Sequence, residues 1–222
     1  MFTRLACFLV MLVCVTLGTP AVASQPVNAR AQEAEFEQLQ RRSTEAEMRG
    51  DFPTAIRLCL LSLQIKPNHQ PTMLALSGLY GKNGQPRQQL VWSARLIAQN
   101  PKEFGAFINQ GNAHKALEQD RAAKDSYLKA KALDPMSPIP HYSLGVLAQE
   151  RNRESEAMAY FQEALKVAPD FEDALFNLAV SHANLGDYAK AVQVLNRLLQ
   201  QNPDDQEARR MRISLDRKMR TQ

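Results

Sequence analysis

The sequence predicts an all-α fold: a solenoid of about five helix-turn-helix units followed by a capping helix at the C-terminal end. Three observations favour it. Prolines recur at a constant interval, each interval holds two amphipathic segments, and helix-favouring residues dominate while strand-like alternation is absent. A two-helix unit cannot bury both of its apolar stripes alone, so the pattern requires neighbouring units.

The interval between the prolines is 34 residues, and it sets the boundaries of the units. The five positions are Pro67, Pro101, Pro135, Pro169 and Pro203. They divide the chain into units 1 to 5, which span residues 36–69, 70–103, 104–137, 138–171 and 172–205.

Unit 4 is the most regular, and its apolar residues form one stripe on each of its two segments. The stripes hold Leu144, Gly145 and Ala148 on the first segment and Ala157, Phe161 and Ala164 on the second. Small residues let two helices approach closely, and large ones fill the space between them. We predict a repeat core that comprises Leu144, Gly145, Ala157, Phe161, Ala179 and Ala191.

The 34-residue period and the order of residue types resemble the tetratricopeptide repeat, whose pattern is W-x2-L-G-x2-Y, then A-x3-F, then P. Unit 4 matches with His141, Leu144, Gly145, Ala148, Ala157, Phe161 and Pro169; unit 5 with Leu175, Leu178, Ala179, His182, Ala191, Leu195 and Pro203; unit 3 with Phe107, Gln110, Gly111, His114, Ala123, Tyr127 and Pro135. The resemblance implies a right-handed solenoid whose concave surface, lined by the first helix of each unit, binds a partner.

Units 1 and 2 depart from this pattern. Unit 1 is weak at its front and recovers from Gly50-Asp51, where the glycine is expected to end one helix and the aspartate to begin the next. In unit 2, polar Gln89 and Ser93 stand at second-helix core positions. We interpret this as a one-residue slip, with an irregular corner over 81–86 and a buried stripe of Leu90, Ala94 and Ile97. Trp92 then lies near the outer face; in the ordinary register it packs inward.

Both ends of the array carry extra residues. Residues 24–35 begin polar and pass into an early start of the first helix at Ala31–Glu35. Residues 206–222 form a basic last helix whose apolar residues are Ala208, Met211, Leu215 and Met219. This helix is interpreted as a polar cap, with a docking site for an acidic partner or an anionic membrane surface as the alternative.

Residues 1–23 have the layout of a secretory signal peptide: Arg4 near the start, an uncharged apolar run over 5–18, and Ala21-Val22-Ala23 as the cleavage site. The rivals are an uncleaved membrane anchor, for which the apolar run is short, and a lipoprotein. We expect an exported chain, periplasmic in a bacterium or secreted. Cleavage near Ala23 leaves Cys59 as the single cysteine, so packing must stabilise the fold without an internal disulfide. Cys59 is expected to be buried, with a reactive thiol as the alternative.

Charge and motifs exclude several functions. The net charge of the sequence is +4. Residues 206–222 alone hold six basic residues against Glu207 and Asp216, a balance of +4, so the rest of the chain is nearly neutral. That distribution argues against nucleic-acid binding, and membrane contact is expected only through the N-terminus or the basic last helix. No histidine pair has ligand spacing, and no nucleophile or phosphate-binding motif occurs. We therefore predict no metal site, no cofactor and no catalytic residues.

The resemblance places the second, fifth, ninth and twelfth residues of each unit on the concave surface. The predicted partner-binding groove contains Leu74, Ile108, Asn112, Ile139, Tyr142, Val146, Phe176, Asn177 and Val180. An apolar patch on a surface that folding need not bury usually marks an interaction site. Asn112 and Asn177 are expected to hydrogen-bond a partner's backbone. The alternative is that curvature or the last helix covers these residues.

These expectations describe a non-catalytic scaffold of the cell envelope that binds a peptide or helix of a partner. By family analogy it serves the assembly of pili, secretion machinery or outer-membrane complexes. The alternatives are a homo-oligomer that closes the same apolar face and a protein tethered to the membrane by an uncleaved N-terminus.

The cleavage site gives a first prediction. Intact mass spectrometry of the exported protein should show Ser24 as the first residue, because signal peptidase cuts after the small residues at 21–23. A mass that retains residues 1–23 would favour the membrane-tethered alternative.

Overall fold

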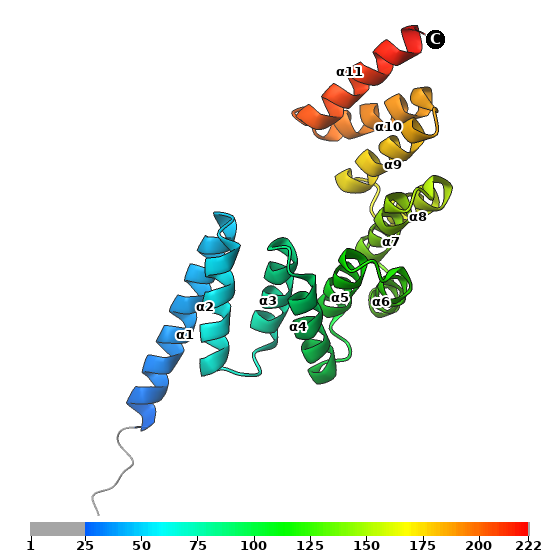
Figure 1. Ribbon diagram of the computed structural model, residues 1–222. Helices are drawn as coiled ribbons and strands as arrows, with labels where there is room; N and C mark the ends of the chain where they lie inside the picture. Colours follow the sequence, from blue (N-terminus) through cyan, green and yellow to red (C-terminus); the bar gives the residue numbers. More distant parts are fainter. Residues whose placement is uncertain (1–24, 222) are drawn as a thin grey trace, which may run out of the picture.

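The computed structural model describes residues 25–221, and that range forms a curved array of helices without strands (Figure 1). The signal peptide predicted for residues 1–23 lies outside the described residues. The helices are α1 (Gln25–Met48), α2 (Phe52–Ile65), α3 (Gln70–Lys82), α4 (Pro86–Gln99), α5 (Phe104–Ala116), α6 (Asp120–Leu133), α7 (Ile139–Glu150), α8 (Glu154–Val167), α9 (Glu172–Asn184), α10 (Tyr188–Gln201) and α11 (Gln206–Arg220).

Helices α1 to α10 stack in pairs, and each pair from α3 and α4 onward lies in one 34-residue interval, whereas α1 begins before unit 1. Helix α5 packs on α6 and α7 on α8, while the first helices of units 2 to 5 also contact one another in sequence, α3 with α5, α5 with α7 and α7 with α9. Figure 1 shows the C terminus at the opposite end of the array from α1. The predicted all-α solenoid is confirmed.

The turn inside every pair has one residue in the left-handed conformation, and these residues repeat every 34 positions. Their φ angles are 74° at Gly50, 68° at Gly84, 58° at Glu118, 56° at Asn152 and 81° at Gly186. Glycine adopts this conformation without steric cost and asparagine tolerates it, whereas glutamate does so at a penalty.

The aspartates that follow two of these glycines act differently. The Asp51 carboxylate accepts a hydrogen bond from the Thr54 backbone N–H at 3.1 Å and caps α2 as expected. Asp187 makes no such bond at the start of α10 and pairs instead with Lys190 at 2.9 Å. Only the first Gly-Asp pair therefore caps a helix through its side chain.

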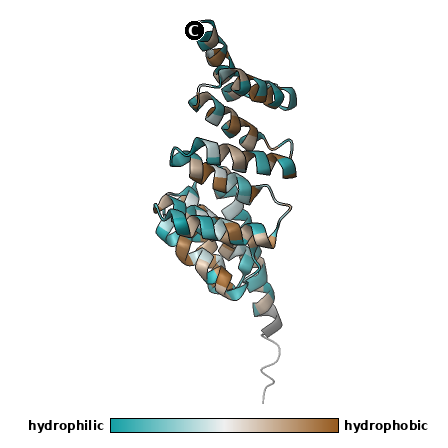
Figure 2. Ribbon diagram, turned by 90° about the vertical axis from the view of Figure 1, so that its right-hand side faces the viewer, coloured by the Kyte–Doolittle hydropathy of each residue, from teal (hydrophilic) through white to brown (hydrophobic). Residues whose placement is uncertain are grey.

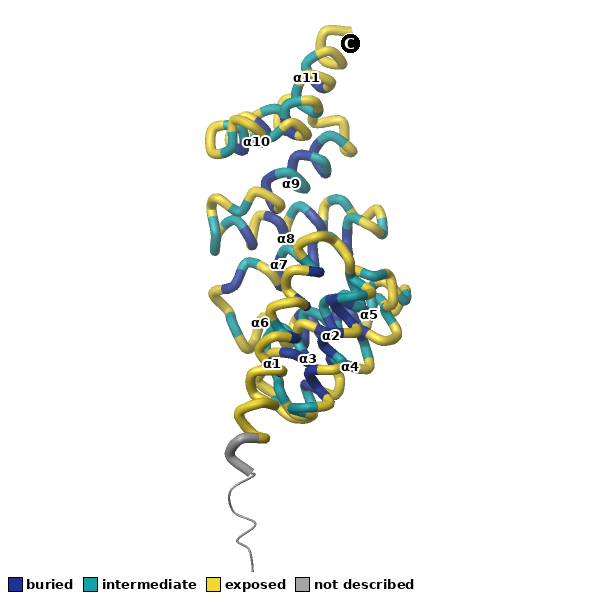
Figure 3. Tube along the Cα trace, turned by 90° about the vertical axis from the view of Figure 1, so that its left-hand side faces the viewer, coloured by how far each residue is buried: buried dark blue, intermediate teal, exposed yellow. Residues whose placement is uncertain are grey.

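The core lies between the two helices of each unit, where a small residue on the first helix faces the side chain at the matching position on the second. A Cβ atom placed on Gly145 would lie 2.5 Å from the Phe161 ring, and Gly111 faces Tyr127 in the same way. The six residues predicted for the repeat core are all buried. Figure 3 shows buried residues along the middle of the stacked helices, and Figure 2 shows apolar and polar residues alternating along each helix.

Unit 1 fills the same interface with two side chains of intermediate size, a serine opposite a cysteine. Ser43 stands where Gly145 does, and its hydroxyl lies 3.1 Å from the Cys59 sulfur. Cys59 is buried, and burial raises the pKa of its thiol. The expectation of a buried cysteine agrees with this placement, because a protonated, enclosed thiol is a weak nucleophile.

The one-residue slip predicted for unit 2 is wrong. Gln89, Ser93 and Leu96 are buried, in the same register as the other units, whereas Ala94 is exposed. The expected corner over 81–86 is absent as well, since α3 continues to Lys82 and Gly84 makes the ordinary turn. Trp92 packs in this ordinary register and lies partly buried against the core of units 1 and 2. The register holds because Gly81 on α3 leaves room for the long side chain of Gln89.

The two end helices differ from the sequence expectations in detail. Helix α1 begins at Gln25, six residues before the early start expected at Ala31, so residues 25–35 are a continuous part of it. Helix α11 packs on α10 with Ala208 and Leu215 buried, and its exposed residues include Arg210, Arg217 and Arg220. Of the described helices, none combines the length and apolar character that crossing a membrane requires.

The left-handed turn residues give a second prediction. Glu118→Gly should raise the free energy of unfolding by up to about 1 kcal/mol, because it removes the left-handed penalty of a residue with a Cβ. The matched variant Gly50→Ala should lower it by about 1 kcal/mol, since nothing lies within 4 Å of a Cβ there and only the backbone conformation matters. Urea unfolding measures both. Equal signs for the two variants would contradict the assignment.

Two buried histidines give a third prediction. His141 and His182 each have a buried Nδ1 without a hydrogen-bond partner among the described residues. Burial lowers the pKa of both; Lys131 lowers that of His141 further, while Asp187 opposes the shift at His182. The folded protein therefore favours the neutral rings, and the unfolded chain binds protons at its ordinary pKa near 6.5.

The contribution of the two neutral histidine rings to the free energy of unfolding should accordingly be complete above about pH 6.5. It should be lost as the pH drops below that value. His141 occupies the position at which unit 3 has Phe107. The variant His141→Phe should show a smaller loss of unfolding free energy between pH 7.5 and pH 5.5 than the wild type. An unchanged pH dependence would show that His141 is not a source of the effect.

Candidate functional site

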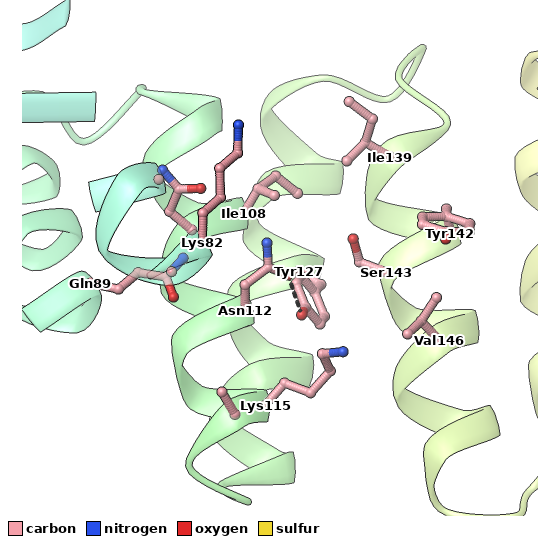
Figure 4. Close-up of a pocket in the computed structure, with 14 residues that line it drawn as sticks. Lys82, Gln89, Ile108, Asn112, Lys115, Tyr127, Ile139, Tyr142, Ser143 and Val146 are labelled. Carbon is pink, nitrogen blue, oxygen red and sulfur yellow. Dashed lines mark hydrogen bonds between the residues drawn. The ribbon is translucent and has the colours of Figure 1, made fainter. Parts of the chain in front are cut away.

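A pocket of about 620 Å³ opens between the first helices of units 2, 3 and 4. Its wall is built mainly from α3, α5 and α7, with one side chain each from α4 and α6. Figure 4 shows these side chains converging on the space between the helices. The pocket therefore lies on the helices that the family pattern assigns to the binding surface.

One wall of the pocket is apolar. Ile108 from α5 and Ile139 and Val146 from α7 line it, and all three belong to the predicted groove. Ile139 is 41% exposed although it is a large apolar residue. The structure thus leaves apolar surface open at this point.

A buried tyrosine fixes the amide on the opposite side. The Tyr127 hydroxyl donates to the Asn112 Oδ1 at 2.8 Å (Figure 4). Burial raises the pKa of Tyr127 far above its usual range, so the hydroxyl stays protonated and remains the donor. This hydrogen bond holds the oxygen side of the Asn112 amide against Tyr127. The N–H groups on the other side of the amide remain for a ligand.

The two charged residues of the pocket are both lysines, and each has a glutamate partner. Lys82 pairs with Glu47 at 2.8 Å, and Lys115 pairs with Glu150. Each pair joins the first helices of adjacent units, α1 with α3 and α5 with α7. The pocket is consequently close to neutral, even though its lining contains only basic charges.

Tyr142 and Asn177 are less free than the sequence suggested. Tyr142 is half-buried and lines the pocket, but its ring also lies 5.9 Å from that of Phe161 and 5.1 Å from that of Phe171. The Asn177 amide donates to the Tyr142 hydroxyl at 3.0 Å and to the Asp173 carbonyl at 3.1 Å. Both N–H groups of Asn177 are engaged, so the expected donation to a partner's backbone is not available from it.

The other predicted groove residues lie outside the pocket. Leu74 fills the space beside Gly105, where a Cβ would approach it to 3.0 Å. Phe176 packs partly buried against the core of unit 5 and α11, and Val180 lies on the same helix α9. Of the nine predicted residues, the pocket thus gathers Ile108, Asn112, Ile139, Tyr142 and Val146.

Sequence reasoning missed Gln89 and Lys82, which also line the pocket. Gln89 sits on the second helix of its unit, which the family pattern does not assign to the binding surface. The signal was present, because Gln89 stands where each other unit has alanine, but it was interpreted as a register slip.

The described residues contain no group of three or more histidine, cysteine or acidic side chains placed to hold a metal ion. The pocket offers amide, ammonium and apolar groups, which suit recognition of a polypeptide.

Stacked helix pairs with a partly apolar pocket on their first helices define a helical-repeat binding protein. Two family models described as tetratricopeptide repeat match the sequence, at residues 104–135 and 148–212. The protein belongs to the tetratricopeptide-repeat superfamily. This fold is that of a protein–protein interaction scaffold, and its repeats generally bind protein partners.

Known sequences resemble this chain over part of their length. Protein O-mannosyl-transferase TMTC3 of Homo sapiens is 30% identical over 50% of this chain and 12% of its own length. Protein FlbA of Caulobacter vibrioides is 24% identical over 66% of this chain and 24% of its own length. The match therefore spans a quarter or less of these relatives.

Solved structures share the fold. A thermophilic TPR protein of Thermus thermophilus superposes with a TM-score of 0.72 and 19% identity, covering 81% of this chain and 98% of its own. Pseudomonas aeruginosa pilF gives a TM-score of 0.64 and 15% identity over 86% of this chain and 93% of its own. At these identities the likeness concerns the fold alone.

Proposed function

We propose that this protein is a non-catalytic adaptor that holds a segment of a partner protein in the pocket between α3, α5 and α7. The observation that carries the proposal is the open apolar wall of Ile108, Ile139 and Val146 beside an amide that keeps its donors. Apolar burial supplies affinity, and the polar groups fix orientation.

The relation to an O-mannosyl-transferase does not change this proposal. The match spans 12% of that protein, and the segments of this chain that family models match, residues 104–135 and 148–212, are repeat sequence. We infer that the shared property is partner binding rather than transfer chemistry.

We also propose that the adaptor acts in the cell envelope, where its partners belong to assemblies such as pili, secretion machinery or outer-membrane complexes. Support comes from the signal-peptide pattern of residues 1–23 and from the use of such repeats as scaffolds. Crosslinking in the native envelope, followed by pull-down and mass spectrometry, identifies the partner; recovery of cytoplasmic proteins alone would refute this placement.

A fourth prediction tests the pocket. Ile139→Asp should weaken partner capture by roughly ten- to a hundredfold, since it removes one buried aliphatic side chain from the interface. The melting temperature should change little, because Ile139 is the first residue of α7 and an acidic residue suits a helix N-terminus.

The matched control is Ile213→Asp, which changes an isoleucine that is 48% exposed on α11, outside the pocket. It should leave capture unchanged. Equal losses for both variants would argue against the pocket. Sedimentation addresses the homo-oligomer alternative: a dimer that dissociates on Ile139→Asp would show that the apolar wall binds a second copy of the protein.

A further inference from the structure

Gln89 is a buried amide at a position where the fold otherwise uses alanine. The equivalent residues of the other four units are Ala55, Ala123, Ala157 and Ala191, and all four are fully buried. Gln89 is 4% exposed and lines the pocket, and its amide atoms are not among the enclosed side-chain polar atoms of the described residues that lack a hydrogen-bond partner. The amide therefore meets the open space of the pocket, where the polar groups of a ligand can replace water as its hydrogen-bond partners.

Gly81 makes room for this amide. A Cβ placed on Gly81 would lie 2.6 Å from the Gln89 Nε2 and 2.8 Å from both Cδ and Oε1. The other units have larger residues at the position of Gly81, namely Glu47, Lys115, Gln149 and Ala183. The glycine and the glutamine therefore form a pair: the amide rests against the backbone of α3 because no side chain is there.

Among the other polar side chains of the pocket, both asparagines and both lysines are already engaged in whole or in part. Asn109 donates to the Ser77 hydroxyl at 2.6 Å and to the Leu74 carbonyl at 3.4 Å. The Asn112 oxygen is taken by Tyr127, and both lysines are paired with glutamates. Beside the Ser143 hydroxyl, Gln89 is thus the amide of the pocket that presents a donor and an acceptor together, and Figure 4 shows this amide directed from α4 toward Asn112.

A primary amide offers N–H donors and a C=O acceptor in one plane, which complements the backbone carbonyl and N–H groups of an extended polypeptide. Inside a helix those backbone groups are already bonded to each other. The lack of free charge in the pocket also disfavours a terminal carboxylate or a charged side chain.

We propose that Gln89 is the specificity-determining residue of the pocket, and that it grips the backbone of an extended, uncharged segment whose aliphatic side chain lies against Ile108, Ile139 and Val146. This proposal for Gln89 rests on the proposed function. It specifies the ligand as an extended peptide rather than an amphipathic helix.

The experiment uses random twelve-residue peptides displayed on phage and selected on the wild-type protein. The best peptide is then synthesised in its parent form, with single backbone N-methyl groups along its length, and as a hydrocarbon-stapled helix. Binding is measured by fluorescence anisotropy on the wild type and on Gln89→Ala, Gly81→Ala and the double variant.

Gln89→Ala should bind the parent peptide about tenfold more weakly, the effect of losing paired hydrogen bonds at a desolvated site. Gly81→Ala should show a similar loss because its methyl group displaces the amide. The double variant should be no weaker than Gln89→Ala, and should melt at or above the wild-type temperature, since it restores the alanine of the other units. N-methylation of the one backbone nitrogen that bonds to Gln89 should weaken binding to the wild type and leave binding to Gln89→Ala unchanged.

Tighter binding of the stapled helix, or an N-methyl effect that is equal on the wild type and Gln89→Ala, overturns the proposal; so does a selection that enriches no peptide. The variant Ile139→Asp distinguishes a failure of the proposed binding pocket from a failure of the role proposed for Gln89. If Ile139→Asp abolishes peptide binding while Gln89→Ala binds the peptide as tightly as the wild type does, the pocket is the binding site but the role proposed for Gln89 is wrong. If both variants bind like the wild type, the pocket itself is not the site.

Discussion

The close approach of the two helices in each unit is the contact on which the rest of the structure depends. A small residue on the first helix faces the side chain at one matching position on the second, as Gly145 faces Phe161 and Ser43 faces Cys59. The size of one side chain fixes the size of the other, because protein interiors leave little empty space. The helix pair keeps a constant separation, and the units can stack with a constant period.

Contacts between successive units hold the stack in register with polar side chains. The Gln149 amide donates to the Ser181 hydroxyl at 3.0 Å, and the Arg151 guanidinium makes a two-pronged contact with Asp120, at 2.8 to 3.1 Å. Exposed pairs of this kind add little stability individually. Helices α3, α5 and α7 lie side by side because the first helices of consecutive units also pack on one another, and the pocket opens between them.

In unit 2, a larger side chain on the second helix is matched by a missing side chain on the first, at a different position from the Gly145–Phe161 contact of unit 4. Gln89 adds a long polar side chain to the second helix, and Gly81 removes a side chain from the first, so the helix pair keeps its ordinary register. The exchange converts core volume into a polar group that faces the pocket. An apparent defect of the repeat pattern is thus the feature that gives this pocket its specific chemistry.

The sequence by itself determined the helical units, their 34-residue period and the buried residues of the regular units, because each unit is a local pattern of apolar spacing. It also located Ile108, Ile139 and Val146, since the first helices repeat the same faces. Only the tertiary structure decided which of the nine groove residues share a pocket, that Asn177 is occupied by Tyr142, and that Gln89 keeps the register. These depend on side chains from different helices and units meeting in space, and no linear period encodes how one residue's volume compensates for another's.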